Sequence, residues 1–292
     1  MVLAAGLIGC GGDVKTNTNL AAVDTTAPVN DWQLVWSDDF DGTSIDREKW
    51  THEVNCAGGG NNEKQCYTDS AENSFVADGK LHIVALPAPE GSPLPYTSAR
   101  LNTKYQGDFK YGRFEMRAKL PSGQGSWPAF WMLPTDEVYG EWPKSGEIDI
   151  LEAVNLKAVN ADGVAEANVH GTLHYGRSWP NNESSGKAYL LPDDLNPADD
   201  FHTYAIEWQE GEISWFVDGV RYATQRSTDW FTDAKQIMPD ITASAPFDQR
   251  FHLLLNLAVG GNWAGNVNDK GVNESVFPQS LQVDFVRVYQ RP

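Results

Sequence analysis

The chain has 292 residues, with 40 acidic side chains against 22 basic ones and a formal net charge of −18. This charge argues against a nucleic-acid-binding protein, because phosphates bind to basic surfaces, and against electrostatic docking on anionic lipids. The length allows one large domain or two small ones. Hydrophobic residues make up 41% of the chain, which is enough for a substantial core. The sequence contains no run of 18 or more apolar residues, so it predicts no membrane-spanning helix.

The first thirty residues have the order of an export signal and a linker. The apolar run MVLAAGLIG precedes Cys10, as in a bacterial lipobox, where the signal peptide is cut before a cysteine that receives lipid. Residues 11–30 are small, polar and aperiodic, which indicates a flexible linker. We expect residues 1–30 to be a lipoprotein signal, truncated because its basic region is missing, followed by that linker. A chance tetrapeptide in an unstructured start is the alternative.

Two further cysteines lie in a segment rich in Gly and Asn. Cys56 and Cys66 are ten residues apart, so a short-loop disulfide is expected if the protein is exported. Two reduced thiols are the alternative.

Apolar and polar residues alternate with period two from Trp32 onward, and no stretch shows a sustained period of 3.6. A period of two indicates strands with one face in a core, and Glu210-Gly211 is typical of a hairpin turn. We therefore predict an all-β sandwich or barrel of antiparallel sheets in residues 31–292. The predicted strands are 81–85, 111–120, 203–209, 212–218, 251–259 and 281–290.

Three acidic residues lie close together in the segment 127–155. Glu147 and Asp149 alternate with apolar residues and so share one face of a strand. Glu152 is five residues from Glu147, which would place it on the core face, where an unpaired carboxylate is costly. One extra residue at Ile150-Leu151, a β-bulge, would return Glu152 to the acidic face. We predict that bulge.

Crowded carboxylates raise one another's pKa, so one can stay ionised while another keeps its proton. Retaining glycoside hydrolysis needs such a pair, with carboxyls about 5–5.5 Å apart. The neighbouring Trp127, Trp131 and Trp142 could stack on sugar rings. The alternatives are a solvated acidic edge strand or a Ca²⁺ site for the acids, and a place in the core for each tryptophan.

The acidic segment resembles the active-site strand of glycoside hydrolase family 16, whose bulged form is Glu-x-Asp-x-x-Glu, and the preceding YGEWPKSG at 139–146 is similar to the laminarinase (endo-1,3-β-glucanase) branch. The resemblance covers about residues 32–290. It implies a concanavalin-like β-jelly-roll of two curved antiparallel sheets, with the substrate cleft on the concave face of a catalytic domain. The supporting motifs are WSDDFDG at 36–42, GNNE at 60–63, YGRFE at 111–115, HGTLHY at 170–175 and NLAVGGNW at 256–263.

By position, the resemblance implies that Glu147 is the nucleophile, Glu152 the acid/base and Asp149 an assisting carboxylate. His174 would hydrogen-bond near Glu152 or a sugar hydroxyl, with a purely structural histidine as the alternative. The resemblance implies that six further residues line the subsites, although the two cysteines depart from the usual pattern and put the place of the first in doubt. These residues are Asn61, Arg100, Trp127, Trp131, Trp142 and Trp263.

No cofactor is implied for catalysis. Many members of the family bind one structural Ca²⁺ on the convex face, and the matching positions here are Asp39, the carbonyl of Gly79, and Asp284. Two acids with carbonyls and waters make a reasonable site for a hard cation. The alternative is that no metal binds and both acids are solvated.

The sequence thus predicts an endo-acting retaining hydrolase of β-1,3-glucan. The alternatives are a related hydrolase of mixed-linkage glucan or a marine galactan, and a non-catalytic glucan-binding module. Because all three acids are present, turnover is favoured over binding alone. We expect a monomer that is exported, either secreted or held at the cell envelope, with a lipid at Cys10 as its sole membrane contact.

Overall fold

The structure is a computed structural model that describes residues 31–238, 240–266 and 271–292. The predictions of a lipidated Cys10 and of a signal and linker in residues 1–30 therefore fall outside the described residues. Residues 32–292 form one unit. None of the helices in the described ranges is long and apolar enough to cross a membrane.

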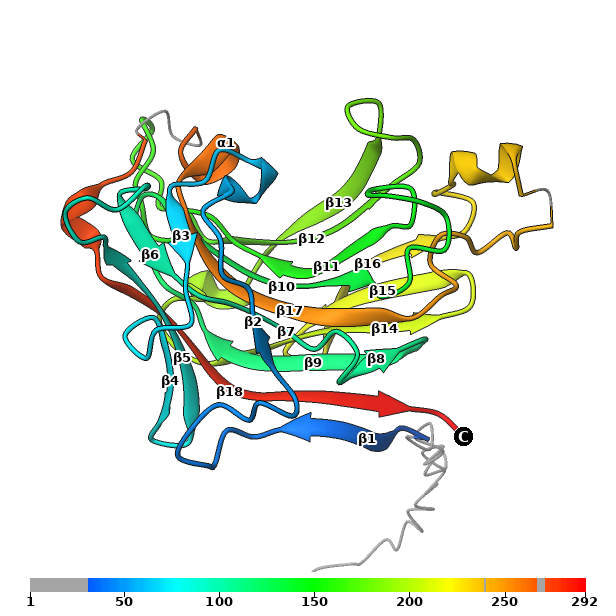
Figure 1. The fold of residues 1–292 in the computed structure, drawn as a ribbon, viewed down its shortest axis with the longest axis horizontal. Coiled ribbons are helices and arrows are strands. Elements are labelled where there is room, and N and C mark those ends of the chain that lie inside the picture. The colour runs from blue at the N-terminus through cyan, green and yellow to red at the C-terminus, as the bar shows by residue number, and fades with distance from the viewer. Residues whose placement is uncertain (1–30, 239, 267–270) are drawn as a thin grey trace, which may run out of the picture. The chain divides into compact units, whose positions relative to one another are not determined.

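Two β-sheets make up this unit (Figure 1). The first sheet contains, in spatial order, β16 (Val220–Arg226), β15 (Glu212–Val217), β14 (His202–Gln209), β9 (Gly112–Lys119), β18 (Gln279–Gln290), β5 (Lys80–Pro87), β6 (Tyr96–Ser98) and β3 (Gln65–Tyr67), with β1 (Gln33–Asp38) beside β18 and β4 (Ser74–Ala77) beside β5. The second sheet contains β13 (Glu183–Leu190), β12 (Asn168–Tyr175), β11 (Glu147–Glu152), β10 (Ser126–Pro134), β17 (Phe251–Val259), β7 (Arg100–Asn102) and β2 (Thr51–His52), with β8 (Asp108–Phe109) beside β17.

Helical segments in the described ranges are short. They are α1 (Gly261–Ala264) and the 3₁₀ turns η1 (Gly58–Gly60), η2 (Pro192–Asp194), η3 (Asp233–Gln236) and η5 (Glu274–Val276). The strand pairings are antiparallel except that of β3 with β6. The expected class, an all-β sandwich of antiparallel sheets, is confirmed.

The sequence alternation places the core between the two sheets. On β9, Phe114 and Met116 are fully buried, whereas Arg113 and Glu115 point outward and form an ion pair. Burying an apolar side chain of this size stabilises the fold by about 1.5–3 kcal/mol. Strands β14 and β15 form the predicted hairpin, with Gly211 at a positive φ of 74° in the turn.

Candidate active site

Alternate residues of β10 face opposite sides of the second sheet. Phe130 and Met132 are fully buried in the core, whereas Trp131 and Leu133 line a cleft of about 700 Å³. Strands β7, β17, β10, β11, β12 and β13 all contribute to the lining, together with the loop 59–63. Since neighbouring strands lie about 4.8 Å apart, the cleft crosses enough of the sheet to hold several sugar units.

The predicted bulge on β11 is confirmed by the strand register. Opposite β12, Asp149 pairs with Thr172 and Glu152 pairs with His170, so three steps along β11 match two along β12. The register of β11 against β10 shifts at the same place. Ile150 is 2% exposed, so the extra residue goes to the core while Glu152 returns to the cleft.

Glu147 begins β11, and its carboxylate receives one strong hydrogen bond. Trp142 Nε1 donates to Glu147 Oε2 at 2.7 Å, and His174 Nε2 lies 3.8 Å from the other oxygen. Burial and the charge of Asp149 raise the pKa of Glu147, while His174 and the Trp142 hydrogen bond act in the opposite direction. The balance of these effects raises the pKa of Glu147 to about 8, so the ionised form that a nucleophile needs depends on His174 and Trp142.

Asp149 is 2% exposed and lies between the two glutamates. The buried indole of Trp215, from the first sheet, donates to its backbone oxygen at 2.8 Å, which holds the strand where the bulge begins. Its carboxylate Oδ2 lies 3.3 Å from His174 Nε2. Burial alone would lower the pKa of His174, but its contacts with Asp149 and Glu147 raise it to about 9. His174 is therefore an imidazolium at neutral pH.

His174 was expected to hydrogen-bond near Glu152 or a sugar hydroxyl; its charge does reach Glu152, but its nearest carboxylates are those of Asp149 and Glu147. The register pairs His174 with Glu147, and it is His170 that lies opposite Glu152. The cation thus lies on the side of the proposed nucleophile, where it favours an ionised carboxylate.

Glu152 is placed to keep a proton. Burial, followed by the charge of Asp149, raises its pKa well above the ordinary value of a carboxyl. Trp127 Nε1 donates to Glu152 Oε1 at 3.0 Å. The carboxyls of Glu147 and Glu152 therefore differ in their neighbours, which is the arrangement that acid/base catalysis requires.

The four predicted tryptophans line the cleft in different ways. Trp127 is 8% exposed and packs edge-on against Trp263 at 5.3 Å, so its indole N–H serves Glu152 and its face is largely covered. Trp142 is 41% exposed. The Trp131 indole is fixed by a 2.7 Å hydrogen bond to Asn256 Oδ1, and its ring can serve as a platform on the side away from Arg100.

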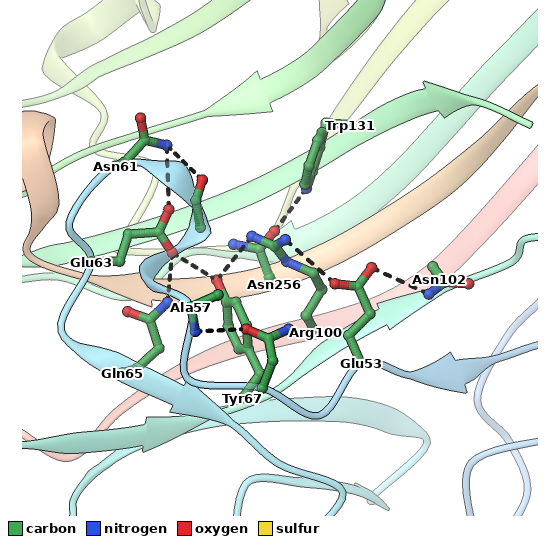
Figure 2. A network of polar contacts seen from close by, with 12 residues as sticks. Glu53, Ala57, Asn61, Glu63, Gln65, Tyr67, Arg100, Asn102, Trp131 and Asn256 are labelled. Carbon is green, nitrogen blue, oxygen red and sulfur yellow. Dashed lines mark hydrogen bonds and ion pairs between the residues drawn. The ribbon is translucent and has the colours of Figure 1, made fainter. Parts of the chain in front are cut away.

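Asn61 and Arg100 lie at the β7 side of the cleft (Figure 2). Asn61 Nδ2 donates to Glu63 at 3.3 Å. Arg100 forms a 3.5 Å ion pair with Glu53 and lies 5.2 Å from the centre of the Trp131 ring. Both residues line the cleft.

Cys56 and Cys66 form a disulfide in the structure, which closes the loop that carries Asn61. Several cleft residues escaped the sequence argument, among them Trp179 and Glu63. Trp179 lines the cleft with 70% of its surface exposed, and Glu63 lies beneath Asn61. The signal for Trp179 was a large aromatic residue in the polar turn 176–182, and the signal for Glu63 was an acidic residue two positions after Asn61.

Two groups of side chains could be considered for a metal. Glu147, Asp149 and His174 have ligand atoms within 4.8 Å of one another, and a metal there would have to displace the proton of His174. The predicted calcium positions do gather where β18 passes from β5 to β1. Here, however, Asp39 pairs with Arg287 at 2.6 Å. Asp284 likewise pairs with Arg117 at 2.6 Å.

Comparison with known proteins agrees with this geometry. A family model described as the GH16 domain of β-porphyranases A–D matches residues 32–291. The chain is 40% identical over 293 residues to a glucan endo-1,3-β-glucosidase A1 of Niallia circulans, covering 95% of this chain but 41% of that protein. It is 42% identical over 294 residues to a β-glucanase of Rhodothermus marinus, covering 97% and 91% of the two chains.

Among solved structures, the laminarinase from Rhodothermus marinus superimposes with a TM-score of 0.75 at 42% identity, covering 89% of this chain and 98% of that one. This likeness confirms the expected jelly-roll. With the family model matched from residue 32 to residue 291, the chain belongs to glycoside hydrolase family 16.

Proposed function

We propose that this chain is an endo-acting, retaining hydrolase of β-1,3-glucan. The observation that carries the proposal is the bulge on β11, which brings Glu147 and Glu152 to one cleft face on either side of Asp149. A cleft that crosses six strands suits attack within a chain. The glucanase and laminarinase names of the relatives support the same substrate.

The reaction follows from the unequal neighbours of the two glutamates. The Glu147 carboxylate attacks the anomeric carbon and forms a glycosyl ester, while the Glu152 carboxyl gives its proton to the departing glycosidic oxygen. Glu152, now ionised, takes a proton from water, and the resulting hydroxide attacks the anomeric carbon and releases Glu147. Two inversions retain the anomeric configuration.

The charge of the chain favours a neutral polysaccharide over a sulfated galactan. Four acids line the cleft, namely Glu63, Glu147, Asp149 and Glu152. In the described part of the chain, Arg100 and Lys187 are the lining Arg and Lys side chains, and Arg100 is already paired with Glu53. With Glu152 protonated and His174 cationic the charges of the cleft nearly balance, so it is the net charge of −18 on the whole chain that opposes a sulfated polymer.

The direct test is reducing-end release from laminarin, mixed-linkage β-glucan, agarose and porphyran, with Glu147→Gln as the control. Release from laminarin that disappears in the variant supports the proposal, and the relative rates define linkage preference. Release from agarose or porphyran alone would favour a galactan hydrolase. Binding to glucan without any release would favour the non-catalytic module.

Replacing Trp131 by alanine is expected to weaken laminari-oligosaccharide binding by about 1–3 kcal/mol, by analogy with other aromatic stacking contacts. The ring lines the cleft and its N–H is held by Asn256. Calorimetric titration in the Glu147→Gln background measures the loss without turnover. Trp32→Ala, which removes a tryptophan that lies against Arg291, is the control, and equal affinities in the two variants would refute the platform.

We also propose that the chain is an exported monomer, either secreted or anchored through a lipid at Cys10. The support is the order of apolar run, cysteine and linker in residues 1–30, together with the Cys56–Cys66 disulfide, because disulfides persist in oxidising compartments. The net charge of −18 makes copies repel one another. Mass spectrometry of the protein from its own cells would show the acyl chains.

Structural calcium remains a prediction. The ion would have to take Asp39 and Asp284 from Arg287 and Arg117, so the acids fit it only if both arginines move away. If it binds, EGTA is expected to lower the melting temperature by roughly 5 °C or more, the effect of losing a ligand held at about 100 times its Kd. An unchanged melting temperature and no calcium by elemental analysis would show that the arginines alone neutralise the acids.

A further inference from the structure

Glu63 is a buried carboxylate outside the catalytic strand. It is 5% exposed, and a buried charge is costly unless hydrogen-bond donors satisfy it. Figure 2 shows its donors: Gln65 Nε2 at 2.6 Å and Tyr67 Oη at 3.3 Å from one oxygen, and Asn61 Nδ2 at 3.3 Å from the other. None of the three is a cation, so neutral groups hold this charge in place.

Tyr67 connects Glu63 to Arg100. Arg100 Nη2 donates to Tyr67 Oη at 3.4 Å, and the guanidinium lies 4.5 Å from the centre of the Tyr67 ring. Burial raises the pKa of Tyr67, so its hydroxyl keeps the proton that it donates to Glu63 while it accepts from Arg100. On its other side, Arg100 faces the Trp131 ring at 5.2 Å.

The loop backbone is shaped around this carboxylate. Gly59 has a φ of +56°, and a Cβ on it would lie 2.1 Å from Glu63 Oε1. Gln65, which donates to Glu63, also accepts from the backbone N–H of Val259 at 2.7 Å. The position of Glu63 is therefore fixed from β17 on one side and from its own loop on the other.

We propose that Glu63 is a positioning residue for substrate binding at the β7 side of the cleft. One of its oxygens holds Asn61, and the other holds Arg100 through Tyr67, so both polar groups stand in place before a sugar arrives. Pre-organisation of this kind lowers the entropy lost on binding. The inference rests on the proposed glucanase function.

The test compares Glu63→Gln, Glu63→Asp and the wild type on laminari-oligosaccharides of increasing length. Glutamine keeps the size of the side chain but replaces an acceptor by a donor, which opposes the donors that surround it. We expect KM to rise about tenfold for the longer oligosaccharides, the effect of one lost hydrogen bond to a charged group. The kcat is expected to stay within about twofold, because the lost contact is equal in ground and transition states.

Glu63→Asp restores the negative charge, so its KM is expected to lie between those of Glu63→Gln and the wild type. Glu90→Gln, at an exposed turn position, is the matched control and is expected to behave as the wild type. Melting temperatures are measured for every variant.

The outcomes separate this inference from the function on which it rests. A wild-type chain that releases nothing from laminarin refutes the proposed function and the role of Glu63 with it. An active wild type with an unchanged KM in Glu63→Gln overturns the role of Glu63 alone. A lower melting temperature and kcat with an unchanged KM would assign Glu63 to the fold, and that result also overturns the inference.

Discussion

Glu147→Ala is expected to lower kcat on laminarin by roughly 10⁴-fold or more, the order seen when a nucleophile is removed from other hydrolases. The carboxylate is the group that would bond to the anomeric carbon. Its contacts are to Trp142 and His174 at the cleft surface, so its removal breaks no contact in the core. We therefore expect an unchanged melting temperature. Reducing-end release and thermal unfolding measure the two quantities.

Azide distinguishes the nucleophile from any other essential acid. In Glu147→Ala, azide can occupy the vacated space and attack from the same face, while Glu152 still protonates the leaving group. The expected product is an α-glycosyl azide formed from a β-linked substrate. A β-glycosyl azide, or near-normal kcat without azide, would contradict the assignment. Glu141→Gln, exposed on the loop before β11, is the matched control and should remain fully active.

The bulge on β11 was predictable because two physical demands conflict in the sequence. Alternation puts Glu147 and Asp149 on one face, and a regular strand would bury Glu152 at a high cost in free energy. An extra residue at Ile150-Leu151 resolves the conflict, and the register shows it. The strands themselves were predictable for a similar reason, because their period fixes which side chains enter the core.

The partners of the acids were not predictable in the same way. Trp127 and Glu152 are 25 residues apart, and their hydrogen bond depends on how β10 and β11 align. His174 lies beside Asp149 and Glu147 because of the register of β12, whereas sequence spacing alone left its neighbour open. Trp179 lies outside the strands and carries no periodic signal, so its place in the cleft required the fold.

Glu152→Gln is expected to slow the first step of the reaction, cleavage of the glycosidic bond, only when the leaving group needs a proton. Without a proton donor, kcat/KM for laminarin should fall by roughly 10²–10⁴-fold, the usual contribution of general acid–base catalysis. A β-laminaribioside with a dinitrophenyl leaving group needs no protonation, so its first step should be nearly unaffected and the glycosyl ester at Glu147 should accumulate. Mass spectrometry of the intact protein detects the ester. Azide should then release a β-glycosyl azide, the opposite anomer to that from Glu147→Ala.

The pH profile of the same variant tests which group holds the proton. Burial and the charge of Asp149 raise the pKa of Glu152, so the free enzyme should lose kcat/KM for laminarin as the pH rises through that value and the proton leaves. With the dinitrophenyl substrate, Glu152→Gln should lack this alkaline limb. A limb that persists unchanged in the variant would place the titration elsewhere, and His174, with its pKa of about 9, is the group that would then carry it, because its loss of charge removes the cation beside Glu147.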